Sequence, residues 1–223
     1  MNIWFASGNI HKKAELAAIL ANAIFASAIH GEAIPEGQGC TILIPQDAGL
    51  HFDPEETGSS FRENALLKAG ELYSLLTKHR PPLFVPGDPI IADDSGICVD
   101  ALDGRPGIFS ARYAGPGADA AQRNTLLLEE LGDSPRRSAR FVCAMALLFS
   151  PDRFFLAQET LEGEIVNSPE AARGSGGFGY DPILFIPELN RTVAELSEEE
   201  KNTISHRAKA GKNIAAILRS VCL

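Results

Sequence analysis

The residues Ile90-Ile91-Ala92-Asp93-Asp94-Ser95-Gly96 determine how the rest of the chain is interpreted. A short apolar run, which we interpret as a buried strand, ends here in two carboxylates, a hydroxyl and a glycine. Ligands of α/β proteins bind at the carboxyl ends of strands, and adjacent carboxylates are costly there unless a cation neutralises them. Magnesium suits such a site because it commonly takes one or two carboxylates together with substrate phosphates. A solvated turn is an equally good interpretation of this segment taken alone.

Other short apolar runs predict further strands on both sides of this one. They lie at residues 3–6, 41–44, 141–149, 154–160 and 183–186. The second run lies within a stretch rich in Gly, Pro and acidic residues (31–58), so it predicts one extra strand or hairpin. The four residues between the third and fourth runs, Ser150 to Arg153, also have the spacing of a hairpin.

Apolar residues at helical spacing predict four helices. The first follows the N-terminal strand, the second begins near Ser60, the third covers 119–131 and the fourth forms the C-terminus. Serine and glutamate three residues apart predict capping boxes at Ser60–Glu63 and Ser197–Glu200. Because helices and strands mix without repeats and without a linker, the sequence predicts a single α/β domain over residues 1–223.

The composition excludes several classes of protein. The 223 residues include 20 Lys and Arg against 29 Asp and Glu, a net charge of −9, which argues against nucleic acid or an acidic membrane as a partner. The four cysteines are scattered, so we expect buried free thiols in a reducing compartment rather than a zinc site or a disulfide framework. No signal peptide is visible, and the longest apolar run, 143–149, is too short to span a bilayer. A cytoplasmic location is therefore expected.

The segment Ser7-Gly8-Asn9-Ile10-His11-Lys12 joins the first strand to the first helix and is a candidate phosphate site. The first turn of a helix presents unpaired N–H groups and the positive end of the helix dipole. Gly8 would let the backbone approach a ligand, and Lys12 would reach it as a point charge. The spacing is not that of a Walker A motif, and the alternative is that Ser7 or Asn9 merely caps the helix.

The cluster Gly174-Ser175-Gly176-Gly177-Phe178-Gly179 has the letters of a dinucleotide fingerprint but not its context. That fingerprint needs a strand before it and a helix after it, whereas here a polar segment precedes and a strand follows. We therefore expect a flexible loop carrying Phe178, Tyr180 and Asp181, in which a ring stacks on a purine and a carboxylate reads a ring N–H. A structural turn with Phe178 in the core is the alternative.

A polar cluster, Lys201, Ser205, His206 and Arg207, lies near the start of the predicted C-terminal helix. Arginine and histidine together clamp phosphate or donate to a base carbonyl, although a solvated helix face is the commoner role of such a cluster. The other histidines have no metal-ligand spacing, which disfavours a zinc enzyme.

Taken together and in this order, the motifs resemble the inosine triphosphatase family, the noncanonical purine nucleoside triphosphate pyrophosphatases (XTP/dITP diphosphatases). The likeness extends from Ile3 to the C-terminal helix. It is carried by Ser7-Gly8-Asn9 with Lys12, Glu55-Glu56-Thr57-Gly58 with Phe61, Glu63-Asn64-Ala65 with Lys68-Ala69, Asp93-Asp94-Ser95-Gly96, Pro106 to Tyr113, Gly176 to Pro182 and Ser205-His206-Arg207.

The resemblance implies an elongated mixed β-sheet flanked by helices, with two lobes around a nucleotide cleft, and a homodimer. It implies a Mg²⁺-dependent reaction in which ITP, dITP or XTP becomes the monophosphate plus pyrophosphate. Two segments, 31–53 and 80–89, look longer than the family's usual form. From the implied reaction, the substrate is expected to be a small nucleoside triphosphate.

The resemblance also implies a role for each matching residue. Asp94 would be the general base and a metal ligand, Glu55 would be the second acidic metal group with Glu56 a close competitor, and Ser95 would contact the substrate. Lys68 would join Lys12 in stabilising the departing pyrophosphate. The triphosphate would be held by Ser7, Gly8, Asn9, Ile10, His11 and Lys12. The base and sugar would be surrounded by Phe178, Gly179, Tyr180, Asp181, Lys201, His206 and Arg207.

Two rival interpretations remain. A nucleotide pyrophosphatase of the Maf type would act on pyrimidine or modified nucleotides, but the Ser-His-Arg triplet and the Gly-Gly-Phe-Gly-Tyr-Asp loop argue against it. A non-catalytic nucleotide-binding or sensor protein would keep the cleft without the chemistry. The acidic pairs Asp93-Asp94 and Glu55-Glu56 argue against that interpretation.

Overall fold

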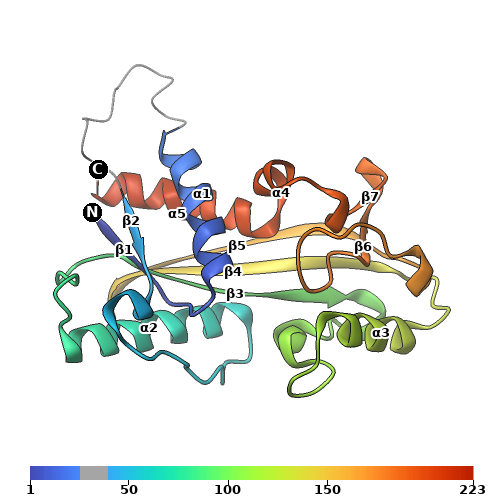
Figure 1. Cartoon of the computed structure of the whole chain (residues 1–223), viewed down its shortest axis with the longest axis horizontal. Helices are drawn as coiled ribbons and strands as arrows, with labels where there is room; N and C mark the ends of the chain where they lie inside the picture. The colour runs from blue at the N-terminus through green and yellow to red at the C-terminus, as the bar shows by residue number, and fades with distance from the viewer. Residues whose placement is uncertain (26–39, 223) are drawn as a thin grey trace. The chain divides into compact units, whose positions relative to one another are not determined.

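The computed structural model describes residues 1–25 and 40–222 (Figure 1). Seven strands form one mixed sheet in the order β2-β1-β3-β4-β5-β6-β7. The strands are β1 (Asn2–Phe5), β2 (Thr41–Leu43), β3 (Ile90–Val99), β4 (Ser138–Ser150), β5 (Arg153–Ile165), β6 (Leu184–Ile186) and β7 (Arg191–Thr192). The helices are α1 (Ile10–Phe25), α2 (Phe61–His79), α3 (Ala120–Leu131), α4 (Glu198–Ile204) and α5 (His206–Cys222). The predicted α/β class is confirmed.

Short 3-10 helices occupy several of the connections: η2 (Pro45–Ala48), η3 (Asp100–Leu102), η4 (Gly107–Arg112), η5 (Pro169–Ala171), η6 (Pro187–Leu189) and η7 (Val193–Glu195). The apolar island at 41–44 is an added strand and not a hairpin, because β2 pairs in parallel with β1 through Ile3 and Ile42. The predicted excursion that surrounds it falls partly on residues 26–39, which lie outside the described residues. Among the helices that are described, none combines the length and the apolar character that a membrane crossing requires.

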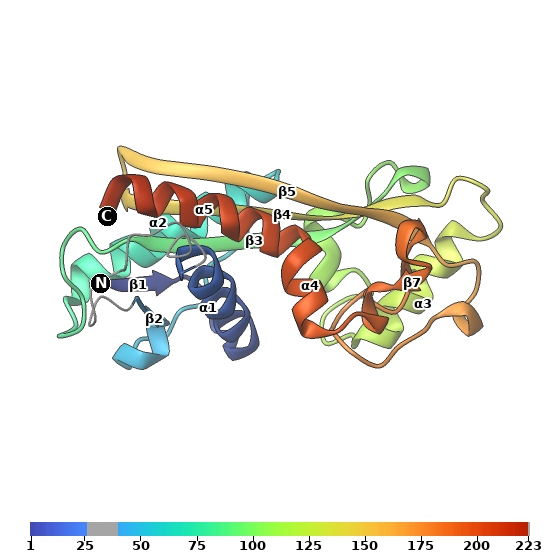
Figure 2. The same ribbon diagram turned by 90° about the horizontal axis from the view of Figure 1, so that it is seen from above.

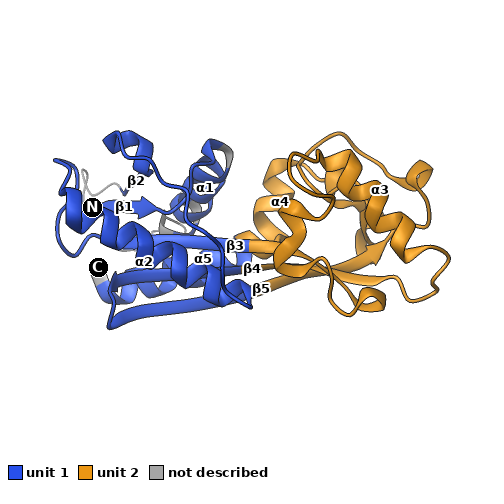
Figure 3. Cartoon of the chain, turned by 90° about the horizontal axis from the view of Figure 1, so that it is seen from below, with its two compact units in different colours: residues 1–94, 144–158, 208–223 blue, residues 95–143, 159–207 orange. Residues whose placement is uncertain are grey.

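The chain divides into two compact units, shown in Figure 3. Unit 1 contains Met1–Asp94, Ala144–Gln158 and Ala208–Leu223, and unit 2 contains Ser95–Cys143 and Glu159–Arg207. Neither unit is one continuous piece of chain. Each of the three long strands, β3, β4 and β5, contributes residues to both units.

In unit 1, helices cover the sheet on both faces: α1 and α5 lie on one and α2 on the other (Figure 1, Figure 2). Gly211 of α5 lies directly against Ile19 of α1, where a Cβ would stand 2.6 Å from the Cγ2 of Ile19. Arg219 of α5 also donates to the carbonyl of Ala23 at 3.1 Å. Trp4 of β1 is fully buried, as expected for a strand covered on both faces.

Unit 2 has its own core, built around α3. Leu127, Leu128 and Leu131 of that helix pack with Ile97 of β3 and the strand residues that follow the glycine loop. The helix begins at a capping box in which the Asp119 carboxylate accepts the N–H of Gln122 at 2.8 Å. Local capping and tertiary burial therefore agree on where this helix lies.

Predicted boundaries of one strand and one helix are wrong, and one predicted capping box forms only in part. The strand at 90–92 does not end at Asp93 but continues to Val99. The predicted C-terminal helix is two helices, because Ser205 has an extended backbone (ψ 156°) that ends α4 before α5 begins. The capping box at the start of α2 is incomplete: Ser60 Oγ accepts the N–H of Glu63, but the Glu63 carboxylate accepts from Ser59 instead.

The expectation of buried cysteines is confirmed in part. Of the three cysteines that the structure describes, Cys143 is buried, whereas Cys40 and Cys98 are partly exposed. Burial raises the pKa of both partly exposed thiols above the ordinary value. The side chain of Cys222 is outside the described residues.

Candidate active site

The two aspartates of β3 point to opposite faces of the sheet, as successive residues of a strand must. Asp93 accepts from Lys12 Nζ of α1 at 3.0 and 3.1 Å. Asp94 accepts from Lys68 Nζ of α2 at 3.3 Å, and α1 and α2 cover opposite faces (Figure 1). Each carboxylate therefore has its own lysine, and a shared cation is not needed to explain why the two aspartates are adjacent.

Asp94 lies in the more elaborate of the two environments. Its side chain is 8% exposed and accepts from Asn64 Nδ2 at 3.1 Å in addition to Lys68. Burial raises the pKa of Asp94, and the Glu56 charge adds to that effect, while Lys68 and Asn64 oppose it. The result is a carboxyl group whose pKa lies above its ordinary value, which suits a group that takes a proton during a reaction.

Lys68 connects this aspartate to a second acidic residue. Its Nζ donates to Glu56 Oε1 at 2.9 Å and to Asp94 Oδ1 at 3.3 Å. Burial lowers the pKa of Lys68, but the charges of Asp93, Asp94 and Glu56 outweigh burial and hold it above its ordinary value. Lys68 is therefore a buried, charged ammonium group facing carboxylates, a cation placed for an anionic ligand.

The structure separates the two candidate acidic residues that precede α2. The side chains of residues 53–58 alternate between exposed and half-buried, so Glu55 faces solvent while Glu56 turns inward to Lys68. The sequence interpretation placed Glu55 first and kept Glu56 as a close competitor, because both are glutamates in one loop. The structure brings Glu56, and not Glu55, to the Asp94 cluster.

The oxygens of Glu56 and Asp94 fit a magnesium ion. Magnesium demands oxygen ligands in an octahedral arrangement and usually keeps waters and substrate phosphates among them. Within residues 1–25 and 40–222, no group of three or more His, Cys, Asp and Glu gathers that would hold a metal ion by protein ligands alone. A donor set of two carboxylates is the number that this ion commonly takes from a protein when a phosphate ligand supplies the rest.

The segment from Ser7 to Lys12 is built as a helix cap. Asn9 Oδ1 accepts the N–H of Lys12 at 3.3 Å, and Ser7 Oγ accepts the N–H of Asn9 at 3.1 Å. The capping alternative is thus correct as a description of local structure. Ile10 is 67% exposed at the first turn, and the side chain of His11 is outside the described residues. Gly8 lies close to Gln46, whose Nε2 would be 2.9 Å from a Cβ at that position.

A second cluster lies in unit 2, around the glycine loop. The buried Asp181 carboxylate accepts the N–H of Phe178 at 2.8 Å and Lys201 Nζ at 2.7 Å. Lys201 Nζ lies 4.7 Å from the centre of the Phe178 ring, and the Arg207 guanidinium lies 5.6 Å from it. The ring is 55% exposed, so the alternative that places Phe178 in the core is wrong. Two cations beside an exposed ring form a surface suited to stacking a base.

The Ser-His-Arg triplet is buried, so the alternative of a solvated helix face is wrong. Arg207 is 1% exposed and donates to Ser95 Oγ at 3.1 Å. His206 stacks on Phe141 with ring centroids 5.0 Å apart. The break between α4 and α5 at Ser205 places His206 and Arg207 in the first turn of α5, where both pack inward.

Tyr180 differs from the other residues of the glycine loop. Its ring is 4% exposed and its hydroxyl donates to the carbonyl of Ser110 at 2.8 Å, while burial raises its pKa to about 12. The structure thus gives this side chain a place in the core of unit 2. Ser110 and Asn124, which contact the loop, were not singled out from the sequence. Asn64 carried a signal, because it lies one helical turn before Lys68.

The chain is similar to known proteins over almost its whole length. The model of the Ham1 family matches residues 3–217. A dITP/XTP pyrophosphatase of Treponema denticola is 43% identical over 222 residues, which is 98% of this chain and 99% of that protein. A dITP/XTP pyrophosphatase of Thioalkalivibrio sulfidiphilus is 46% identical over 214 residues, 94% of each chain.

Solved structures give the same result. The Ham1 protein of Staphylococcus aureus superposes with a TM-score of 0.79 at 34% identity, covering 99% of both chains. A nucleoside-triphosphatase, dITP/XTP pyrophosphatase, from Mycobacterium abscessus has a TM-score of 0.69 at 38% identity and covers 98% of this chain and 99% of its own. The chain therefore belongs to the Ham1 family.

Proposed function

We propose that this protein hydrolyses noncanonical purine nucleoside triphosphates (ITP, dITP and XTP) to the monophosphate and pyrophosphate, and so removes them from the nucleotide pool. The relatives named dITP/XTP pyrophosphatase support this activity across almost the whole chain. The observation that carries the proposal is the environment of Asp94. This buried carboxylate has a raised pKa and accepts hydrogen bonds from Asn64 and Lys68, and Lys68 also contacts Glu56.

In the proposed reaction, Asp94 accepts the proton of the water that attacks the α-phosphate. Magnesium, held by Asp94 and Glu56 together with phosphate oxygens, would supply charge neutralisation and a more acidic water. Lys68 and Lys12 face the carboxylates of Asp94 and Asp93 in the structure, and their ammonium groups would stabilise the negative charge of the departing pyrophosphate. Asn64 holds the Asp94 carboxylate in place through its Nδ2.

The phosphate-binding part of the proposal extends to the start of α1. Residues Ser7 to Lys12 form the first turn of that helix and the cap before it, where backbone N–H groups and the helix dipole favour an anion. We propose that these residues hold the triphosphate, with Ser95 also contacting the substrate. That role comes from the family resemblance, and the positions of Asn9 and Lys12 are compatible with it.

The purine base would be read by the cluster in unit 2. Phe178 would stack on the ring, and Lys201, His206 and Arg207 would supply donors to the 6-keto oxygen of hypoxanthine or xanthine. Adenine has an amino group at that position, so a buried donor facing it would lose its acceptor, at a cost of about 1–3 kcal/mol. This unfavourable pairing would be the source of selectivity.

Three finer predictions belong to the same proposal: dependence on Mg²⁺, assembly as a homodimer and a cytoplasmic location. The donor chemistry of Glu56 and Asp94 supports the first. The other two rest on the family resemblance and on the expectation that the substrate is a free nucleotide.

The deciding experiment measures pyrophosphate and phosphate released from ITP, XTP, ATP, GTP and UTP, with Mg²⁺ and with a chelator. We expect pyrophosphate from ITP and XTP alone, and none in the presence of chelator. Turnover of UTP in preference to the purines would favour the Maf-type interpretation. Binding of ITP without any turnover would favour the non-catalytic sensor, and release of phosphate would contradict the proposed reaction.

A further inference from the structure

The motif from Pro106 to Tyr113 has no role in the proposed reaction, although it is one of the longest in the chain. In the structure it forms η4 (Gly107–Arg112) and is fixed to β3 by Ser110. Ser110 is 6% exposed, and its Oγ accepts the N–H of Ile97 at 2.9 Å and donates to the carbonyl of Gly107 at 2.6 Å. This hydroxyl therefore joins the short helix to the central sheet of unit 2.

The backbone carbonyl of the same serine holds the glycine loop. It accepts the buried Tyr180 hydroxyl at 2.8 Å. One residue earlier, the carbonyl of Gly179 accepts Asn124 Nδ2 of α3 at 3.2 Å. Two different elements, η4 and α3, thus fasten the two residues that directly follow Phe178.

The loop needs such fastening because of its glycines. Gly177 and Gly179, on either side of Phe178, have φ values of +75° and +65°. Glycine adopts positive φ about as readily as negative φ, so its own backbone preference does not fix the conformation here. At Gly177 a side chain is excluded, because a Cβ would lie 2.0 Å from Asp181 Oδ2. The two glycines restrict the backbone on either side of Phe178 less than other residues would, so contacts with neighbours, among them the Asp181 carboxylate that accepts the Phe178 N–H, determine where the ring lies.

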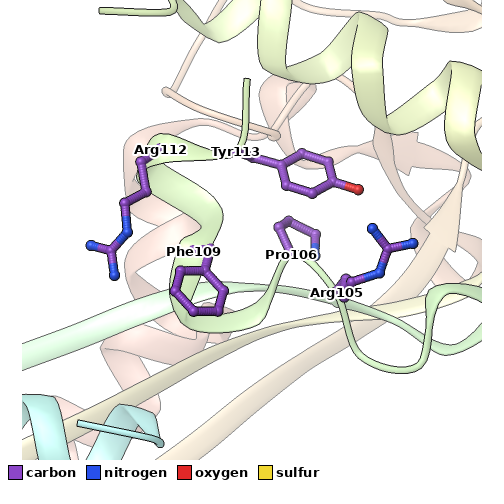
Figure 4. Close-up of a pocket in the computed structure, with 5 residues that line it drawn as sticks. All are labelled: Arg105, Pro106, Phe109, Arg112 and Tyr113. Carbon is purple, nitrogen blue, oxygen red and sulfur yellow. The ribbon is translucent and has the colours of Figure 1, made fainter. Parts of the chain in front are cut away.

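The opposite side of η4 has a different environment, which provides a control. Arg105, Pro106, Phe109, Arg112 and Tyr113 line a pocket of about 330 Å³ (Figure 4). The Tyr113 hydroxyl donates to Glu130 at 2.6 Å, and within the described residues no hydrogen bond joins this hydroxyl to the glycine loop. One motif thus carries a tyrosine whose hydroxyl is bonded away from the loop and a serine whose carbonyl accepts a hydrogen bond from it.

We infer that Ser110, Tyr180 and Asn124 are positioning residues for base recognition, which hold the Phe178 ring where the purine stacks. This inference rests on the proposed function, because it names what fixes the base-stacking residue of that same site. Stacking depends on the position of the ring plane, whereas the phosphate chemistry assigned to unit 1 does not. Loss of the hydrogen bonds made by these residues should therefore weaken binding of the nucleoside part of the substrate and leave the binding of pyrophosphate unchanged.

The first test is Tyr180→Phe, which removes the hydroxyl and keeps the ring. We expect the KM for ITP and the inhibition constant of IMP to rise by about 3- to 10-fold, the effect of one lost hydrogen bond. We expect kcat and the inhibition constant of pyrophosphate to stay within about 2-fold. The matched variant Tyr113→Phe, in the same motif, should change none of the four constants.

The second test is Ser110→Ala, whose lost hydroxyl contacts Ile97 and Gly107 and not the loop. If Ser110 acts by fixing η4 behind Tyr180, this variant should reproduce the rise in KM and in the IMP constant. The double variant should then show less than the product of the two single effects, because both act through one contact. If the double variant shows the full product of the two single effects, or if Ser110→Ala leaves both constants unchanged, Ser110 does not act through Tyr180.

A general loss of stability has to be separated from positioning. Leu161→Ala removes a buried side chain of β5 in the same core, outside the helix that carries Asn124, and provides a variant of matched or greater thermal destabilisation. An equal rise in KM in that variant, or unchanged KM and IMP binding in Tyr180→Phe, would overturn the inference. If the protein releases no pyrophosphate from ITP, the proposed function fails, and calorimetric binding of IMP to the same variants decides the inference by itself. Absence of IMP binding by the unsubstituted protein would overturn both.

Discussion

Asp94 is the residue whose chemistry can be tested most directly. Asp94→Asn keeps the size of the side chain but removes the charge and the basic oxygen, so we expect kcat for ITP to fall on the order of 10²-fold or more. Steady-state kinetics would measure this change, and circular dichroism would check that the fold is kept. Turnover close to that of the unsubstituted protein would remove Asp94 from the mechanism.

Glu56 and Glu55 form a matched pair for testing the second acidic group. Glu56 contacts Lys68, whereas Glu55 is exposed. Glu56→Gln should raise the Mg²⁺ concentration for half-maximal activity by roughly 10-fold, since one of two carboxylate ligands is lost. Glu55→Gln should leave that concentration unchanged. The reverse order of effects in a magnesium titration would return the role to Glu55.

The sequence singled out Asp93 and Asp94 of β3 as candidate site residues but did not predict how they are arranged. Asp, Ser and Gly are turn residues, so a strand that continues through them to Val99 looked like one that had ended. The strand is maintained by partners far away in the chain: Lys12 lies 81 residues from Asp93, and Lys68 lies 26 residues from Asp94. Residue types are local information, whereas these pairings form only in the folded chain.

At the scale of elements, α4 is a short helix whose stability depends on its ends. The Ser197–Glu200 capping box forms as predicted, and Glu200 also accepts two bonds from Arg191 at 2.6 and 3.1 Å. The hydrogen bond from Arg191, followed by that from the Ser197 N–H, lowers the pKa of Glu200 to about 2. Because the helix carries Lys201, its first turn supports one side of the proposed base site.

This pKa shift predicts a pH dependence of stability. A carboxyl group with a folded-state pKa of about 2, below its unfolded value near 4.5, stabilises the fold above pH 4.5, and this stabilisation is lost as the pH falls toward about 2. Glu200→Gln should therefore lower the Tm at pH 7, and the difference from the unsubstituted protein should shrink below about pH 4.5. Thermal unfolding at a series of pH values would measure the difference.

A neighbouring glutamate of the same helix serves as the control. Glu199→Gln removes a charge from the same turn, but the Glu199 carboxylate forms no ion pair with any residue that the structure describes. Its Tm difference should be smaller at pH 7 and should change less with pH. A constant difference for Glu200→Gln across the whole pH series would show that its ionisation does not contribute to stability.

The start of α4 could be predicted from the sequence and its end could not, for a physical reason. A capping box joins groups three residues apart, so Ser197 and Glu200 could be recognised from the sequence alone. The end of α4 at Ser205 depends on tertiary contacts, because His206 stacks on Phe141 and Arg207 donates to Ser95. The full length of β4 was also underestimated, since its ends carry polar residues that no local pattern marks as strand.

At the scale of the whole molecule, the residues of the proposed reaction and those of the proposed base recognition belong to different units. Each unit is built from several separate segments of the chain. Unit 1 contains Asp94 and Lys68, and unit 2 contains Phe178 and Arg207. Strands β3, β4 and β5 each supply residues to both. Cutting any of these strands at the boundary would remove residues from both cores, so neither unit should fold as an independent domain.

This shared construction predicts one unfolding transition, as expected for a single domain over residues 1–223. Leu72 in unit 1 and Leu127 in unit 2 are each fully buried, and truncating either to Ala should cost about 2–5 kcal/mol. Because three strands belong to both cores, we expect Leu72→Ala and Leu127→Ala each to lower the Tm of the same single peak in scanning calorimetry. Two peaks, with each substitution shifting only one, would show that the units unfold separately and that the chain contains two domains.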